Sequence, residues 1–216
     1  EIEVEAPAGH TPGERAWVAR LLHDHPFATL VTPGAEEPLI SHLPLLHVAD
    51  REPHGTLLGH FARANPHWRE AQRCDSIAVF HGPHAYVSPS WYAEPELAVP
   101  TWNYATVHVH GTVEVVDEPA GTRPILDALI HRFEAGRDVP WELRMDAARR
   151  DALVAAIVAF RIRIRHVEAK FKLSQNRPVA DRARVAAALE REGRADATAT
   201  AAWMLAYGGA RDHEPS

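Results

Sequence analysis

Cysteine and lysine are almost absent from this chain of 216 residues. Cys74 is the one cysteine, and Lys170 and Lys172 are the two lysines. A single thiol forms no internal disulfide, and the sequence has no cysteine cluster with the spacing of zinc ligands. We therefore expect the protein in a reducing compartment, and we predict that it is cytoplasmic.

Positive charge is also in the minority. The 23 Lys and Arg residues are outnumbered by 29 Asp and Glu residues, and the formal net charge is −6. A negatively charged protein repels polyanions, and no clear helix-turn-helix pattern is present, so direct DNA binding is disfavoured. No apolar run approaches the roughly 18 residues that a membrane-spanning helix requires, and we expect no association with a membrane.

Familiar catalytic signatures are missing as well. The sequence contains no Gly-x-Ser-x-Gly, no phosphate-binding Walker loop, no dinucleotide-binding Gly-x-Gly-x-x-Gly and no His-Glu-x-x-His. Hydrolase and nucleotide-triphosphatase functions therefore lose their usual support. The composition, 46% hydrophobic and 24% charged, is that of an ordinary globular protein.

Short apolar runs separated by proline and glycine dominate the sequence, and they predict strands. The predicted strands cover residues 27–32, 39–48, 56–62, 76–81, 85–91, 105–117 and 160–165. Apolar residues at helical spacing predict helices over residues 14–25, 119–134 and 147–158, with Asp146 as the N-cap of the third. After Pro178 the composition predicts one helix to about residue 192 and a weaker helical tail.

This order of elements predicts a fold that is mainly β with peripheral helices, an α+β protein. Many short strands with helices late in the chain fit a small β-barrel better than a βαβ arrangement. We predict a single domain over residues 1–216. It carries helical insertions at about residues 119–158 and a C-terminal helical tail at about residues 178–207.

The two lysines point to an anion site. Lys170 and Lys172 are two residues apart, which on a strand gives them one shared face, and Ser174 and Gln175 follow directly. In a chain that otherwise uses arginine, such a pair suits a phosphate. A solvated strand end is the alternative interpretation.

A second candidate site lies at the end of the predicted strand 56–62. Arg63 and the backbone N–H groups of the following turn are placed to converge on an anion, although Asn65 can instead cap a helix. His60 is the first candidate for an axial metal ligand, although a lone strand histidine more often takes part in structural hydrogen bonds.

Histidine and aromatic residues gather further along the chain. His108 and His110 share one strand face and can chelate a metal, but no acidic residue or cysteine close in sequence completes a ligand set. The stretches 81–92 and 100–104 are rich in aromatic residues, proline and small hydroxyl residues. Such loops suit stacking on an isoalloxazine or a porphyrin, or contact with a second subunit.

Six stretches have a composition and an order that are specific enough to compare with known families. They are 26–31 (PFATLV), 41–45 (SHLPL), 55–66 (GTLLGHFARANP), 80–92 (FHGPHAYVSPSWY), 99–104 (VPTWNY) and 170–177 (KFKLSQNR). Together they resemble the PaiB-like family of FMN-binding negative transcriptional regulators over about residues 24–185. The resemblance implies the FMN-binding split β-barrel, a homodimer, and a planar cofactor at the subunit interface.

The resemblance also implies roles for single residues. It places Arg63, Lys172, Ser174 and Gln175 near a phosphate or propionate, with Asn65 in the same cofactor site, and it places Ser41, His42, Trp102 and Asn103 around the ring. The same family includes haem-dependent enzymes that resemble piperazate synthases, which form a nitrogen–nitrogen bond from N5-hydroxyornithine. In that alternative haem b replaces FMN and His60 is the expected ligand, with His42, His67, His84 and His108 as rivals.

FMN is the cofactor that we predict, in a redox or transcription-regulatory role. Haem b and an N–N bond-forming cyclase are the alternative. The three arginines at positions 161, 163 and 165 share one strand face and are the best argument for DNA binding, although such a face usually pairs with carboxylates.

Overall fold

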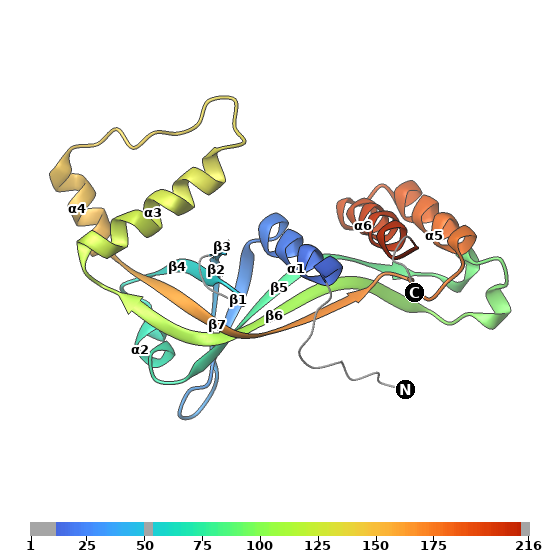
Figure 1. Cartoon of the computed structure of the whole chain (residues 1–216), viewed down its shortest axis with the longest axis horizontal. Helices are drawn as coiled ribbons and strands as arrows, with labels where there is room; N and C mark the ends of the chain where they lie inside the picture. Colours follow the sequence, from blue (N-terminus) through green and yellow to red (C-terminus); the bar gives the residue numbers. More distant parts are fainter. Residues whose placement is uncertain (1–11, 50–53, 213–216) are drawn as a thin grey trace. The chain divides into compact units, whose positions relative to one another are not determined.

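The structure is a computed structural model that describes residues 12–49 and 54–212 (Figure 1). The predictions for residues 1–11 lie outside the described residues. A seven-stranded sheet has the strand order β2-β1-β5-β6-β7-β4-β3. Its strands are β1 (Phe27–Thr32), β2 (Leu39–Pro44), β3 (Leu46–Val48), β4 (Thr56–Ala62), β5 (Asp75–Val87), β6 (Thr101–Val116) and β7 (Ile157–Lys172). The pairs β1/β2, β1/β5, β3/β4 and β4/β7 are antiparallel.

Six α-helices accompany these strands in the described part of the chain. They are α1 (Pro12–Asp24), α2 (His67–Ala71), α3 (Pro119–Glu134), α4 (Ala147–Ala155), α5 (Val179–Glu192) and α6 (Ala195–Asp212). Asp146 caps α4 as predicted, because its side chain accepts a hydrogen bond from Arg149 N at 2.8 Å. None of the helices in the described ranges is both long and apolar enough to cross a bilayer.

The alternation that predicted the strand at 105–117 holds along β6. Its odd positions from Asn103 to Val113 are buried and its even positions are partly exposed, as expected for a strand with one face on a core. The strand starts four residues earlier than predicted, at Thr101. Trp102 and Asn103 therefore lie on a strand rather than in a loop.

Several other element boundaries differ from the sequence prediction. The strand predicted over 39–48 is divided at Leu45 into β2 and β3, and the one predicted over 160–165 is the longer β7. Residues 75–87 form one strand where two were predicted, and the buried positions change phase at Gly82 and Pro83, as at a β-bulge. The helix predicted over 147–158 ends at Ala155, because Ile157 and Val158 pair with β4 instead. Here strand pairing overrides a helical pattern that continues in the sequence.

The described chain divides into two compact units. Unit 1 contains residues 22–80 and 108–168, and unit 2 contains residues 10–21, 81–107 and 169–216 so far as these are described. Strands β5, β6 and β7 contribute residues to both units. The single domain over residues 1–216 stays a prediction.

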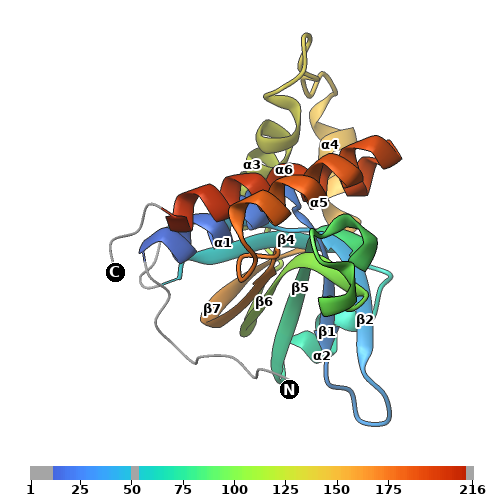
Figure 2. The ribbon, with the colours of Figure 1, turned by 90° about the vertical axis from the view of Figure 1, so that its right-hand side faces the viewer.

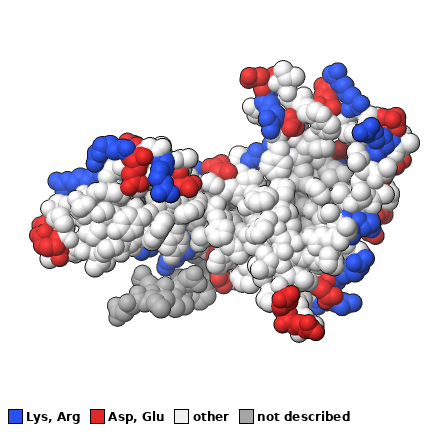
Figure 3. Space-filling view, turned by 180° about the vertical axis from the view of Figure 1, so that it is seen from behind, with Lys and Arg blue, Asp and Glu red and all other residues white. Residues whose placement is uncertain are grey.

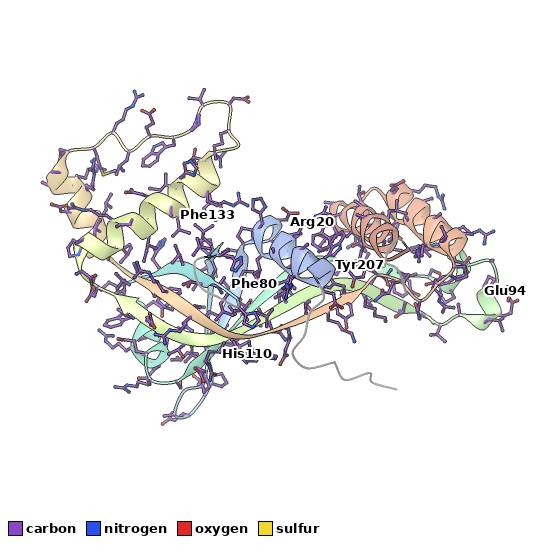
Figure 4. All side chains as sticks on the ribbon, in the orientation of Figure 1. Arg20, Phe80, Glu94, His110, Phe133 and Tyr207 are labelled. Carbon is purple, nitrogen blue, oxygen red and sulfur yellow. The ribbon has the colours of Figure 1, made fainter. Side chains whose placement is uncertain are left out.

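Each unit has its own apolar core. In unit 1, Phe61 and Phe160 are fully buried and their rings lie 4.7 Å apart. In unit 2, α5 and α6 pack side by side (Figure 2), with Leu189 and Met204 fully buried. Tyr207, labelled in Figure 4, lies on α6 with its ring 5.2 Å from that of Trp17 on α1.

Candidate functional site

The ten predicted site residues fall into two groups, one in each unit. Unit 1 holds Ser41, His42, His60, Arg63 and Asn65, and unit 2 holds Trp102, Asn103, Lys172, Ser174 and Gln175.

Ser41 and Asn65 belong to a buried polar network in unit 1. Asn65 Nδ2 donates to Ser41 Oγ at 3.0 Å, and Ser41 Oγ lies 2.8 Å from His67 Nδ1. His67 Nε2 lies 2.7 Å from Thr32 Oγ1, which lies 2.6 Å from Ser76 Oγ. Asn65 Oδ1 also accepts from His67 N at 3.0 Å, so Asn65 holds the start of α2 as well. The network links α2 to β2, β1 and β5.

His67 is neutral in this setting. Its side chain is almost fully buried, and this burial lowers the pKa of the imidazole. Both ring nitrogens already contact hydroxyl groups. His67 is therefore a structural imidazole, and it has no ring nitrogen left for a metal.

Ser41 and His42 point to opposite sides of β2. Ser41 is buried, whereas His42 is exposed and lies 3.1 Å from Thr29 Oγ1 through its Nδ1. The His42 ring stacks near Phe27, with 6.4 Å between ring centroids. Adjacent strand residues face opposite sides of a sheet, so the structure does not bring Ser41 and His42 to one face of a ring.

His60 stands out among the histidines considered as haem ligands. It lines an apolar cavity of about 250 Å³ together with residues of α3, and Phe133 on that helix is labelled in Figure 4. Its Nδ1 is buried and makes no hydrogen bond, and burial lowers the pKa of the imidazole. His42, His67, His84 and His108 each have a polar partner at the ring. His60 is thus a neutral imidazole with an unused ring nitrogen.

Arg63 is occupied by protein groups. It donates to Asp117 Oδ1 at 2.5 Å, to Ala155 O at 2.6 Å and to Ile157 O at 2.7 Å. The hydrogen bond between the two side chains lowers the pKa of Asp117 and raises that of Arg63. These contacts tie the end of β4 to the junction of α4 and β7 and to Asp117, which directly follows β6. This arrangement makes Arg63 a structural residue in the conformation described.

His108 and His110 do meet a carboxylate, which comes from the neighbouring strand. Glu168 of β7 lies 3.6 Å from His108 Nδ1, 3.5 Å from His110 Nε2 and 3.2 Å from His166 Nε2. The position of His110 on β6 is labelled in Figure 4. Across the described ranges, no group of three or more His, Cys, Asp or Glu side chains is arranged to hold a metal ion.

Two of the three arginines on one face of β7 are paired with acidic residues. Arg163 forms an ion pair with Glu114, and Arg165 forms one with Asp75. On the face shown in Figure 3, Lys and Arg lie beside Asp and Glu rather than in one continuous basic patch. This pairing is the alternative that the sequence left open for these arginines.

In unit 2, an exposed aromatic cluster lies on β5 and β6. The rings of Tyr86 and Trp102 are 6.2 Å apart in an edge-to-face arrangement, and His84 lies 6.3 Å from Trp102. Trp102 is 53% exposed and Tyr86 is 43% exposed. Large flat apolar rings with open faces suit stacking against a planar ligand or a second subunit.

Lys172 lies on β7 in the same unit. Its side chain is exposed, and its Nζ donates a hydrogen bond to Thr101 Oγ1, directly before Trp102 in the chain. An ammonium group beside a hydroxyl group is a suitable donor pair for a phosphate. Unit 2 therefore carries open aromatic rings and a cation, the two chemical features that a flavin nucleotide needs.

Ser174, Gln175 and Asn103 make their contacts within the protein. Ser174 is buried, with φ of 60°, and its hydroxyl lies 2.9 Å from Asn103 Nδ2 and 3.2 Å from Asn103 Oδ1. Gln175 Nε2 donates to Phe171 O at 2.6 Å, and Gln175 Oε1 accepts from Leu173 N at 2.8 Å. Asn103 faces the interior while Trp102 is exposed, so the structure does not place both against one ring.

A family model described as "Putative FMN-binding domain" matches residues 6–166. The chain belongs to this family. The "Protease synthase and sporulation protein PAI 2" of Bacillus subtilis is 34% identical over 185 residues, which cover 84% of this chain and 86% of that protein. The resemblance found in the sequence is thereby confirmed.

Solved structures of flavin and haem proteins share the split-barrel fold. The FAD and heme binding protein of Mycobacterium smegmatis has a TM-score of 0.57 at 23% identity, covering 73% of this chain and 71% of that chain. The flavocytochrome Anf3 of Azotobacter vinelandii has a TM-score of 0.56 at 15% identity, covering 72% of this chain and 66% of that chain. At these identities the likeness shows the fold, and it confirms the predicted split barrel.

Several residues that shape this FMN-binding domain were missed by sequence reasoning. Thr32, Ser76 and Thr101 contact predicted site residues or their partners, and His166 and Glu168 contact the histidines of β6. Each of these partners lies far away in the sequence, so no local motif marks the contact. The signal that was available is strand alternation, which puts His166 and Glu168 on one face of β7.

Proposed function

We propose that the protein binds FMN at a subunit interface of a homodimer and works in a redox or transcription-regulatory role. The main observation in support of this proposal is that unit 2 combines exposed aromatic rings with an exposed lysine. Trp102 and Tyr86 would stack on the isoalloxazine, and Lys172 with Thr101 would bind the phosphate. Bound FMN supplies hydride or one-electron transfer. Membership of the FMN-binding domain family supports the choice of cofactor.

The second subunit is proposed because large apolar side chains are exposed in both units. Phe27 is 65% exposed and Ile40 is 60% exposed in unit 1, and Trp102 is 53% exposed in unit 2. Aromatic side chains are enriched at the interfaces between protein chains. Light scattering after size-exclusion chromatography should give about twice the monomer mass of 23.9 kDa. A monomer that binds FMN with high affinity would refute the interface placement.

A regulatory role, if present, would be indirect. Arg163 and Arg165 are paired with Glu114 and Asp75, and such pairing leaves little positive surface for a DNA backbone. Electrophoretic mobility shift of random-sequence duplex DNA should show no complex at physiological salt. A salt-dependent complex that Arg163→Ala weakens would revive direct DNA binding.

The decisive test compares FMN with riboflavin, which lacks the phosphate. Quenching of flavin fluorescence gives both dissociation constants, and dithionite should bleach the flavin band of the complex. We expect FMN to bind more tightly than riboflavin, and Lys172→Ala to weaken FMN by about 10- to 100-fold because it removes a charge-assisted contact. Arg163→Ala is the control cation and should leave FMN affinity unchanged. Equal losses from both variants would refute the phosphate site.

Haem b is the second candidate, and His60 favours it. Haem iron binds a neutral imidazole, and His60 combines a lowered pKa with an unpartnered ring nitrogen and an apolar cavity beside α3. Protein titrated with hemin should then develop a Soret band that His60→Ala removes and His84→Ala retains. A Soret band that survives in His60→Ala would exclude His60 as the ligand. The N–N bond-forming cyclase activity, the alternative function, would require the haem-bound protein.

A further inference from the structure

The side-chain amide of Gln175 forms hydrogen bonds to both peptide groups that flank Lys172. Its Nε2 donates to Phe171 O and its Oε1 accepts from Leu173 N, at 2.6 Å and 2.8 Å. One side-chain amide therefore fixes the backbone immediately before and immediately after the lysine. Both polar atoms of Gln175 are thus engaged with the backbone around Lys172, and one hydrogen of Nε2 is left without a partner among the described residues.

The turn that carries Gln175 is anchored by an unusual serine. Ser174 is the one non-glycine residue with positive φ in the described part of the chain, and at positive φ an L side chain is strained. Glycine would adopt this backbone without strain. The serine hydroxyl, however, makes two contacts with the buried Asn103 side chain, which glycine cannot make.

Asn103 connects this turn to β6, the strand that carries Thr101. It lies on β6 two residues after Thr101, and its Nδ2 also contacts Met204 Sδ at 3.1 Å on α6. The turn after β7 is thus fixed to the strand that holds Thr101. These contacts hold the backbone around Lys172 next to the strand of Thr101, and the side chains of Lys172 and Thr101 are joined by a hydrogen bond.

We propose that Gln175, Ser174 and Asn103 are positioning residues that hold Lys172 and Thr101 ready for the FMN phosphate. This inference rests on the proposed function. It refines the role that resemblance implied for Ser174 and Gln175, from a position near a phosphate or propionate to support of the lysine that contacts the phosphate. A preorganised donor pair loses less conformational freedom when it binds the phosphate.

Gln175→Met is the main test, because methionine keeps the length of the side chain and loses both hydrogen bonds. We expect the Kd for FMN to rise about tenfold and the Kd for riboflavin to stay within about twofold. Gln72→Met is a matched control. Gln72 also donates through Nε2 to a carbonyl four residues earlier, that of Trp68, at 3.2 Å. It should change neither constant.

Ser174→Gly provides a second variant in case Gln175→Met does not fold. Glycine relieves the strain at positive φ but removes the contacts to Asn103, so the protein should stay folded while FMN affinity falls and riboflavin affinity is retained. A merely structural role predicts equal weakening of both flavins, and that result would overturn the inference. So would an unchanged FMN constant in both variants.

The outcomes also separate this inference from the proposed function. If the wild-type protein binds neither flavin, the proposed function fails and the positioning role fails with it. If FMN and riboflavin bind equally well and Lys172→Ala has no effect, the flavin site stands but the phosphate lies elsewhere. If Lys172→Ala acts on FMN alone and Gln175→Met does not, only the positioning role is refuted.

Discussion

Replacing the buried His67 with phenylalanine tests the polar network of unit 1. The side chain is 1% exposed, and its ring centroid lies 5.3 Å from that of Phe61, so a phenyl ring of similar size can keep the packing. The variant loses the contacts to Ser41 and Thr32. Each hydroxyl keeps one other partner, Asn65 or Ser76, so each lost bond costs about 1 kcal/mol. The expected destabilisation is about 2 to 3 kcal/mol, a large share of a typical domain stability.

Urea unfolding followed by tryptophan fluorescence measures this loss. At a slope of about 2 kcal/mol/M, the midpoint should fall by roughly 1 to 1.5 M with the slope unchanged. His84→Phe is the matched control, because His84 is exposed and contacts only Gly82 O, at 3.3 Å, among the hydrogen bonds described. It should stay within about 0.5 kcal/mol of the wild type. A loss below about 0.5 kcal/mol in His67→Phe would refute the reasoning.

Three further predictions follow from other features. Burial lowers the pKa values of His60 and His67, so below about pH 6.5 the unfolded chain binds more protons than the folded chain. The free energy of unfolding should therefore fall from pH 7 to pH 5, and it should fall less steeply in the double variant His60→Phe/His67→Phe. Urea midpoints measured between pH 5 and pH 7 check this pH dependence, and a double variant with the same pH dependence as the wild type would contradict the assignment. Gly111→Ala should cost more than about 2 kcal/mol, because a Cβ there meets the backbone oxygen of Arg163; a near-normal melting temperature would show that β6 and β7 can separate locally. Arg63→Met should lower the melting temperature and leave the FMN constant unchanged, since the guanidinium is used by protein groups; a selective loss of FMN affinity would restore Arg63 to the phosphate site.

Local sequence patterns predicted the elements well where pairing and pattern agree. The alternation along β6 and the helical spacing of α3 each specify a strand or helix without help from distant residues. The end of α4 shows the limit. Ile157 and Val158 continue a helical pattern, and only their pairing with β4 makes them strand. Propensity is a weak guide where a tertiary contact competes with it.

The candidate site was predicted as a set of residue types, and its geometry was not. Lys172 stood out because lysine is rare in this chain, and the structure places it beside Thr101. No sequence pattern indicates that the Gln175 side chain turns back onto the backbone around that lysine. Glu168 was missed because its partners on β6 are about 60 positions away, and only the adjacency of β6 and β7 brings them together.

The network around His67 has a consequence for the direction of its hydrogen bonds. A neutral imidazole donates at one nitrogen and accepts at the other, and each nitrogen here faces a hydroxyl group that can do either. If Ser41 donates to the ring, the bonds run toward Ser76; if Ser76 donates, they run toward Ser41. Both senses satisfy the ring without moving a heavy atom. The tautomer of one buried histidine therefore decides which end of the chain of hydroxyls, at β2 or at β5, keeps a hydrogen to offer.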